Sequence, residues 1–284
     1  MILDKFESEE IFLGNVIALE HINLAVPSQE LATIFYITGL GLTRDPYMSV
    51  GHQNMWVNIG YQQFHLPTRN QQKIPGTIGL TVPSLADLSI RLENIAPYLK
   101  ETEFKFEFRG GELLITCPWG NQIVCSDQGV GSSLIALGIR FIKFDVPVGC
   151  SEKIGKFYSS VLQASVQPVE NEDGVSVKVG NGQVLLFKET TREMPVYDGH
   201  HIAIYLNDFN EVYSSLDKLS LITEVTSEFQ YRFEDIVDVD SGDGVLKLEH
   251  EVRSIRHPMY QRDLVNRNPN QGFLEYVSGE DRFM

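Results

Sequence analysis

Cysteine is scarce in this chain of 284 residues, which contains only Cys117, Cys125 and Cys150. An odd and sparse set argues against a disulfide framework, and its spacing matches no zinc motif. We therefore expect a reducing compartment and a cytoplasmic protein, with the three thiols acting as small apolar side chains. Disulfide-dense scaffolds and cysteine-based zinc sites are excluded as classes.

Long apolar runs are also lacking. No stretch approaches the roughly 20 residues needed to cross a bilayer. The segment MILDKFESEEIFLG at 1–14 has no basic region followed by an apolar core, so we expect no signal peptide. There is no phosphate loop, dinucleotide fingerprint or Ser-His-Asp order, and GNGQ at 180–183 is typical of a hairpin turn.

Positive charge is in short supply. The chain has 23 Lys and Arg residues against 38 Asp and Glu residues, which gives a formal net charge of −15. Such a charge repels phosphate backbones and anionic lipid surfaces, so we expect neither nucleic acid nor a membrane as partner. The hydrophobic share of 43% is ordinary for a globular protein with full cores. With nucleic acid and membranes set aside, the partner that we expect is a small-molecule ligand.

What the chain does contain is one pattern that occurs four times, at intervals of about 60 residues. A short apolar strand ends in a turn, and a helix-like stretch follows. The four strands are HINLAVPS (21–28), TIGLTVPS (77–84), FIKFDVPV (141–148) and HIAIYLND (201–208). A unit of this size cannot bury its own sheet face. It must pair with a neighbour, and the pairing creates a concave surface where function is to be sought.

The order of elements predicts an α+β fold of four βαβββ modules, paired in chain order into two domains. The first domain would span 1–131, with modules at about 14–70 and 71–130. The second would span 132–252, with modules at about 134–192 and 197–252, and the Gly/Ser-rich DQGVGSS at 127–133 would form the joint. We expect the tail at 253–284 to wrap over the second domain.

Two segments carry a resemblance to a known family. HINLAV followed by FYITGLGL (35–42), and FIKFDV followed by FYSSVLQASV (157–166), resemble the vicinal oxygen chelate superfamily, which includes glyoxalase I, methylmalonyl-CoA epimerase, fosfomycin resistance enzymes and extradiol dioxygenases. The resemblance covers about residues 14–252 and implies two glyoxalase-like domains with concave mixed sheets. It also implies a divalent metal, Fe, Mn, Zn or Ni, in a cup between paired modules.

In this family the ligands stand at the start of the first strand and at a point on the last strand of each module. For the N-terminal pair of modules, these positions fall on His21, His65, Thr77 and Val124. Two imidazoles alone bind a metal weakly, so His21 and His65 are the less favoured metal candidates. A histidine at a strand start serves ordinary hydrogen-bond roles equally well.

For the C-terminal pair, the positions fall on Phe141, Leu186, His201 and Glu249. Glu249 reaches this register only if the SGDG turn at 241–244 holds an extra residue or the strand carries a bulge. His201 and Glu249 are therefore the principal metal candidates, and both should face the cup because alternate side chains of a strand share a face.

Four further residue types near this cup suggest roles in catalysis and binding. Tyr205 shares a strand face with His201, and Lys143 shares one with Phe141, so both are candidate catalytic residues. A lysine ammonium beside Glu249 would favour an ion pair over a metal. In the tail, Arg253, Arg256 and His257 are candidates for holding a substrate carboxylate, or alternatively for pairing with the acidic surface beneath them.

Two interpretations of function remain open at this point. By resemblance, the protein is a metal-dependent enzyme of the glyoxalase or dioxygenase type that acts on a small oxygen-rich molecule, such as a catechol, a hydroxy acid or an α-keto compound. Alternatively, it is a metal-free ligand-binding or scaffold protein without catalysis, since neither pair of modules carries three ligands. Whether it is an enzyme is open. A homodimer is compatible with both, because modules of this family swap between chains.

Overall fold

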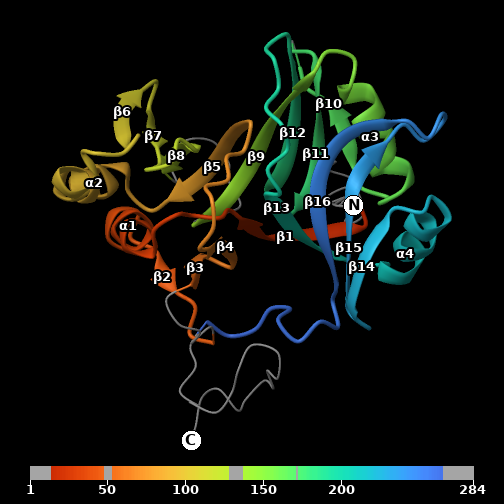
Figure 1. Cartoon of the computed structure of the whole chain (residues 1–284), viewed down its shortest axis with the longest axis horizontal. Coiled ribbons are helices and arrows are strands. Elements are labelled where there is room, and N and C mark those ends of the chain that lie inside the picture. The colour runs from red at the N-terminus through yellow and green to blue at the C-terminus, as the bar shows by residue number, and fades with distance from the viewer. Residues whose placement is uncertain (1–13, 48–52, 128–136, 171, 265–284) are drawn as a thin grey trace, which may run out of the picture.

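The computed structural model describes residues 14–47, 53–127, 137–170 and 172–264 (Figure 1). Each of four modules has a strand, a helix and three further strands. The first module contains β1 (Val16–Asn23), α1 (Gln29–Ala32), the π-helical η2 (Thr33–Gly39), β2 (Thr43–Arg44), β3 (Asn54–Ile59) and β4 (Gln62–Pro67). The second contains β5 (Gly76–Val82), α2 (Leu85–Leu99), β6 (Lys105–Arg109), β7 (Glu112–Thr116) and β8 (Gln122–Asp127).

The third module contains β9 (Gly138–Pro147), α3 (Ser151–Ser160), β10 (Val166–Pro168), β11 (Gly174–Gly180) and β12 (Gln183–Thr190). The fourth contains β13 (His201–Leu206), α4 (Phe209–Lys218), β14 (Ile222–Ser227), β15 (Gln230–Val237) and β16 (Gly244–Ser254). The repeated Val-Pro-Ser segment precedes the helix in the first two modules. It follows the end of β1 at Asn23 and of β5 at Val82, and the hydroxyls of Ser28 and Ser84 then accept hydrogen bonds from the backbone N–H groups of Leu31 and Asp87 at the helix start.

The modules pair differently from the expected chain order. One eight-stranded mixed sheet runs β14-β15-β16-β13-β1-β4-β3-β2, and the other runs β10-β11-β12-β9-β5-β8-β7-β6. The α+β class with two concave mixed sheets is confirmed, but β1 pairs with β13 and β5 pairs with β9. The first module therefore shares a sheet with the fourth, and the second with the third. The expected pairs 14–130 and 134–252 are corrected accordingly.

The modules that were expected to pair, the first with the second and the third with the fourth, do meet, but through their helices. Gly39 of η2 lies so close to Ile95 of α2 that a Cβ at Gly39 would stand 2.3 Å from the Ile95 side chain. Phe157 of α3 packs on Phe233 of β15, with ring centroids 5.9 Å apart. In the repeat pattern, the first strand of every module has an unpaired edge of the same kind. The pattern therefore cannot specify which module's first strand it pairs with.

The connections that cross between the sheets run through 68–75 and 191–200, and they lie side by side. Gln72 Nε2 donates to the Asp198 carbonyl at 2.9 Å, and the Lys73 backbone N donates to Asp198 Oδ2 at 2.6 Å. The expected joint at 127–133 instead lies between β8 and β9, two strands of the same sheet, and 128–136 fall outside the described residues.

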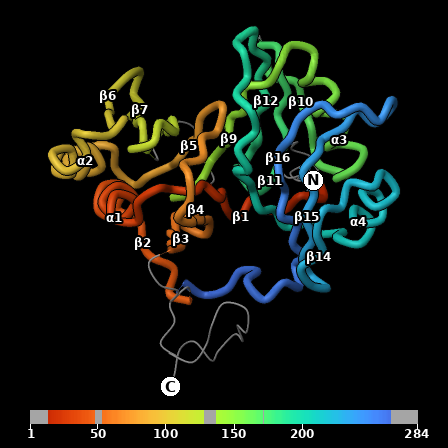
Figure 2. The backbone as a smooth tube through the Cα atoms, in the orientation of Figure 1, coloured from red at the N-terminus to blue at the C-terminus, as the bar shows by residue number. Residues whose placement is uncertain are grey.

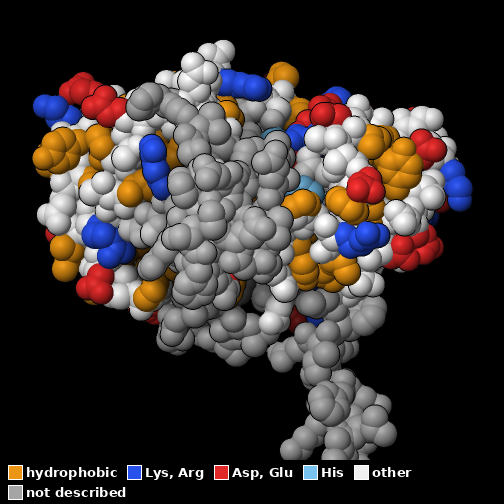
Figure 3. Space-filling view, turned by 90° about the horizontal axis from the view of Figure 1, so that it is seen from below, with side chains coloured by type: hydrophobic (Ala, Val, Ile, Leu, Met, Phe, Trp, Pro, Cys, Tyr) orange, Lys and Arg blue, Asp and Glu red, His pale blue; other side chains and the backbone are white. Residues whose placement is uncertain are grey.

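Apolar side chains of alternate strand positions form the core under the helices, and the other face of each sheet stays free to form a cup. The cysteines are free thiols, of which Cys117 and Cys125 are buried. Burial raises the pKa of the Cys125 thiol to about 12. None of the described helices is long and apolar enough to cross a membrane. On the described part of the face in Figure 3, Lys and Arg side chains lie scattered, with no extended basic patch.

After β16 the chain runs across the open side of the first sheet towards the first module, as the tube in Figure 2 shows. Arg253 and Ser254 still belong to β16, so the tail begins later than expected. The described part at 255–264 reaches Asp45 near β2, through Arg262. The tail therefore spans both modules of the sheet, and residues beyond 264 lie outside the described part.

Candidate metal centre

A bulge in β1 supplies two neighbouring side chains to the cup of the first sheet. Leu19 opposes Ile204 and His21 opposes Ala203, so Glu20 is an extra residue on β1. Leu19 and Ile22 belong to the hydrophobic core, whereas Glu20 and His21 both turn away from it and hydrogen-bond each other. A strand without the bulge would have sent one of the two into the core.

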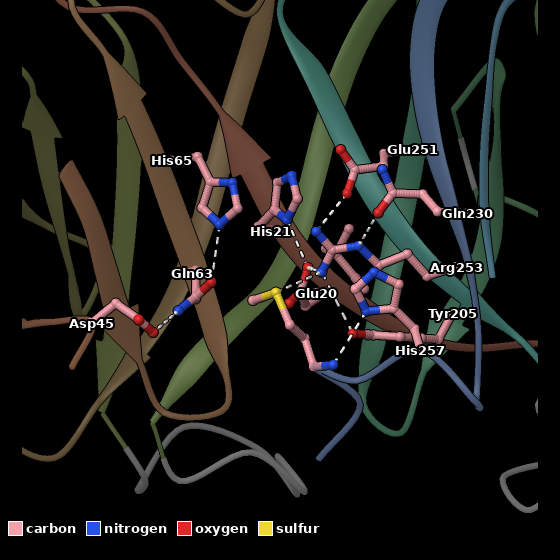
Figure 4. A network of polar contacts seen from close by, with 12 residues as sticks. Glu20, His21, Asp45, Gln63, His65, Tyr205, Gln230, Glu251, Arg253 and His257 are labelled. Carbon is pink, nitrogen blue, oxygen red and sulfur yellow. Dashed lines mark hydrogen bonds and ion pairs between the residues drawn. The ribbon is translucent and has the colours of Figure 1, made fainter. Parts of the chain in front are cut away.

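Because the first and fourth modules share this sheet, the two expected half-sites merge into one. Figure 4 shows His21 and His65 of the first module beside Glu251 of the fourth. His21 of β1 stacks on His65 of β4, with ring centroids 3.6 Å apart. The ring of His201 on β13 meets His21 edge-on at 5.7 Å, and His201 pairs in register with Glu249 of β16. Four side chains that chain-order pairing would divide between two cups thus face a single one.

The arrangement contains a group suited to a metal ion. One ligand-type atom each from His21, His201 and Glu251 lie within 4.8 Å of one another. Glu251 was not among the expected ligands. It stands two residues beyond Glu249, and strand alternation therefore places it on the same face. Its register opposite Ala203, one strand away from His21, is what brings it into the group.

His21 is poised to use one defined nitrogen. Its side chain is fully buried, and its Nδ1 lies 2.6 Å from Glu20 Oε2. Since a carboxylate accepts hydrogen bonds, Nδ1 carries the proton and Nε2 carries the lone pair. Nε2 is buried and has no hydrogen-bond partner among the described residues. A carboxylate behind a histidine in this way is the usual support of a metal-binding imidazole.

His201 is held as a neutral imidazole. Burial is the largest cause that lowers its pKa well below the ordinary value, and the neighbouring His21 and Arg232 add to it. Its Nδ1 lies 3.2 Å from Glu249 Oε1, which leaves Nε2 as the free lone pair. Metal ions bind neutral imidazole, so the depressed pKa keeps His201 competent at neutral pH.

Two arginines balance most of the negative charge in the cup. Arg253 Nη1 lies 2.5 Å from Glu20 Oε2 and its Nη2 lies 2.5 Å from Glu251 Oε1, while Arg232 pairs with Glu249 and Glu251. Burial alone would raise the pKa of Glu20, but Arg253 and the His21 hydrogen bond outweigh it and lower that pKa to about 2. Three carboxylates therefore face two guanidiniums, and the group retains one negative charge when its imidazoles are neutral.

The donor set fits a divalent ion. Two imidazoles and one carboxylate form the common ligand set of open Zn, Fe and related sites, which leave positions for substrate oxygens. The unpaired His21 Nε2, its Glu20 support and the residual negative charge all favour a cation at this place.

Lys143 lies elsewhere, which corrects its expected position beside Glu249. It belongs to β9 of the second sheet, where its register partners are Leu186 and Thr77. It therefore cannot take part in chemistry at the candidate centre. The ligand positions of the second sheet fall on Thr77, Val124, Phe141 and Leu186, a set without imidazole or carboxylate.

Of the other expected site residues, some lie near the candidate metal centre and one lies away from it. Arg253 is buried in its two ion pairs, and Tyr205 OH lies 3.5 Å from Arg253 Nη1. Burial, followed by Arg253, lowers the pKa of His257 to about 4, and its ring lies 6.4 Å from that of Tyr205. Arg256 instead is exposed and lies over the Phe229 ring at 5.3 Å, away from the centre.

Three residues that the sequence did not single out support His65. Its Nε2 lies 2.9 Å from Gln63 Oε1, and Gln63 Nε2 donates to Asp45 Oδ2 at 2.6 Å. Trp56 stacks on the other side of His65, with centroids 3.8 Å apart and planes 4° from parallel. Strand alternation gives Trp56, Gln63 and His65 the same face, but no motif distinguishes the first two from ordinary polar and aromatic positions.

The fold has counterparts among solved structures. A candidate dioxygenase from Bacillus subtilis is 15% identical with a TM-score of 0.55, over 84% of this chain and 86% of that one. Glyoxalase I from Zea mays is 14% identical with a TM-score of 0.56, over 84% of this chain and 92% of that one. No protein-family model and no curated protein matches the sequence. At these identities the likeness establishes the fold.

Proposed function

Since the chain has the fold of the vicinal oxygen chelate superfamily, we propose that it is a metal-dependent enzyme acting on a small oxygen-rich molecule. The centre is the cup shared by the first and fourth modules. The observation that carries the proposal is the grouping of His21, His201 and Glu251, with the buried Nε2 of His21 left without a partner among the described residues.

Each nearby side chain has a role in this proposal. His21, His201 and Glu251 hold the ion, and Glu20 keeps the proton of His21 on Nδ1. A bound divalent ion would act as a Lewis acid on two neighbouring oxygens of the substrate. Burial raises the pKa of Tyr205, so its hydroxyl stays protonated and serves as a hydrogen-bond donor rather than as a base.

Access is expected from the side of Arg232 and Glu249. The side chain of His21 is 0% exposed, that of His201 is 12% exposed and that of Glu249 is 26% exposed. A substrate entering there meets the Glu249 carboxylate beside His201. Glu249 is therefore our candidate for accepting a substrate proton, while Arg232, which already pairs with it, orients the carboxylate.

A second candidate function is a metal-free cup that binds a polar small molecule without turnover. The observation in its favour is that the two oxygens of Glu251 form ion pairs with Arg253 and Arg232, so the charge of this carboxylate is balanced without a cation. Buried charges that balance one another can serve as a rigid binding surface alone.

Metal analysis separates the two functions. Protein purified without chelator, then supplied with Fe(II), Mn(II), Zn(II) or Ni(II), is expected to retain about one ion per chain. His21→Ala, His201→Ala and Glu251→Gln should each lose it. His200→Ala is the matched control, because this neighbouring histidine pairs with Asp198 outside the group. A wild-type content far below one ion per chain under all four metals contradicts the enzyme proposal. Ligand binding that chelator leaves unchanged then supports the second function.

A further inference from the structure

The C-terminal segment at 255–264, here called the strap, is built into the wall of the cup. Arg262 is buried and forms an ion pair with the buried Asp45, which lies 217 residues earlier in the chain. The Arg262 guanidinium also lies 4.6 Å from the centre of the Tyr47 ring. Between these anchors and β16, the ring of Tyr260 meets that of Tyr205 at 4.9 Å. A buried ion pair of this kind holds the strap in one position.

From Asp45 a chain of hydrogen bonds leads inward. The Asp45 carboxylate only accepts, so Gln63 must turn its amide nitrogen towards it, at 2.6 Å. The same nitrogen donates to Asn58 Oδ1 at 2.5 Å. The amide orientation of Gln63 is thus determined twice, and its Oε1 faces His65.

The carbonyl oxygen of Gln63 in turn decides the tautomer of His65. Because Oε1 only accepts, His65 Nε2 carries the proton. The His65 ring is clamped between Trp56 at 3.8 Å and His21 at 3.6 Å, with both neighbours stacked. The ring of His21 therefore stacks on His65, and the orientation of His65 depends on Asp45 through Gln63.

We propose that Arg262 is a positioning residue of the candidate metal centre, which sets the His21 ring through Asp45, Gln63 and His65. The inference rests on the proposed function, since it concerns the geometry of that centre. Without the guanidinium, Asp45 is left as a buried charge lacking its strongest partner in the strap. A shift of Asp45 then weakens one of the two contacts that orient the Gln63 amide, and the stack above His21 loosens.

Co(II) is the probe, because its visible absorption reports ligand geometry without requiring turnover. Arg262→Met is expected to weaken Co(II) binding by about tenfold and to alter the absorption bands, as is usual when support behind a ligand is lost. Gln63→Leu, which interrupts the relay far from the strap, should give the same change. Arg256→Met is the matched control, because this arginine belongs to the same segment but is exposed.

The outcomes are distinguishable. Equal Co(II) affinity and bands in wild type, Arg262→Met and Gln63→Leu overturn the positioning role and leave the metal centre standing. Absence of Co(II) binding in the wild type overturns the proposed function and this inference with it. Where Arg262→Met fails to fold by circular dichroism, Gln63→Leu decides alone, since it removes no buried charge. Loss of binding in Arg256→Met as well would overturn the relay, because any disturbance of the segment would then suffice.

Coupling of this kind must also act in reverse. At saturating Co(II), proteolytic cleavage within the strap of the wild-type protein is expected to slow by several-fold, and Gln63→Leu should lose this protection while still binding the ion. Equal protection in both proteins would mean that Co(II) stabilises the whole molecule without passing through Gln63, and would overturn the inference.

Discussion

Glu20 and Arg253 form a buried ion pair across the seam between the first and fourth modules, with 2.5 Å between Oε2 and Nη1. The two residues are 233 positions apart in the sequence. The same guanidinium reaches Glu251 on its other side, so it joins the support of one candidate ligand to another candidate ligand. The pair ties the docking of two distant modules to the charge balance of the cup.

Arg253→Met is expected to destabilise the protein by about 3–5 kcal/mol, because it leaves Glu20 and Glu251 as buried carboxylates that share too little positive charge. Arg256→Met, on the exposed side of the same segment, should change the free energy of unfolding by less than about 1 kcal/mol. Urea unfolding of the two variants beside the wild type measures the difference. Similar midpoints for both variants would contradict a structural role for the ion pair.

A buried histidine in the core makes stability depend on pH. His250 Nε2 lies 2.6 Å from the Tyr158 hydroxyl, and burial lowers the pKa of His250 from 6.5 to about 4. Between pH 6.5 and pH 4, the unfolded chain therefore binds a proton at His250 that the folded chain does not bind. The resulting stability is complete above pH 6.5 and is lost as pH falls towards 4, by about 3 kcal/mol.

His250→Gln removes this titration and keeps an acceptor for Tyr158. Its stability is expected to fall less than that of the wild type between pH 6.5 and 4, as thermal or urea unfolding at stepped pH would record. Part of the fall persists, because burial also lowers the pKa values of His65, His201 and His257. Parallel pH profiles for variant and wild type would show that His250 titrates normally.

Local structure could be predicted from the sequence where the hydrophobic spacing agrees with the positions of turn and helix-capping residues. The four strands expected at 21–28, 77–84, 141–148 and 201–208 overlap β1, β5, β9 and β13, and a helix follows each of them, as expected. Alternation also placed His201 and Glu249 on one face of the sheet, and their register partnership bears this out. These features depend on residues close in sequence, which a pattern of period 2 or 3.6 records directly.

Long-range pairing could not be predicted in the same way. Four modules with equivalent first strands permit several pairings, and the choice depends on edges and helix contacts that no local pattern records. The bulge at Glu20 depends on how β1 pairs with β13, and the ion pair of Arg262 with Asp45 depends on where the strap lies. Neither could be predicted before these long-range contacts were known. One wrong pairing then divided a single four-residue cup into two incomplete halves and placed Lys143 beside Glu249.

The position of Lys143 yields a direct test of the module pairing. Lys143→Met is expected to leave metal content and the Co(II) spectrum unchanged, because Lys143 lies in the second sheet with Thr77 and Leu186 as register partners. Glu251→Gln, measured in parallel, should abolish both. If Lys143→Met raised or removed metal binding, the third and fourth modules would have to share a cup, in conflict with the observed sheet order.

Gln183 of the third module supports the bulge from the neighbouring domain. Its Oε1 accepts from the backbone N of Leu19 at 3.1 Å, and its Nε2 donates to the carbonyls of Leu19 and Ile139 at 3.2 Å each. Leu19 immediately precedes Glu20 and His21, so one buried amide supports the strand segment that presents both residues to the cup.

Gln183→Leu is expected to destabilise the protein by about 1–3 kcal/mol, since it leaves buried backbone groups of Leu19 without partners. It should also weaken Co(II) binding, because the bulge that presents His21 loses its support. Gln167→Leu, an exposed glutamine on β10 of the same sheet, is the matched control and should change neither quantity. Loss of stability with unchanged Co(II) affinity would mean that β1 retains its bulge without Gln183, so that the pairing of β1 with β13 alone suffices to aim His21 into the cup.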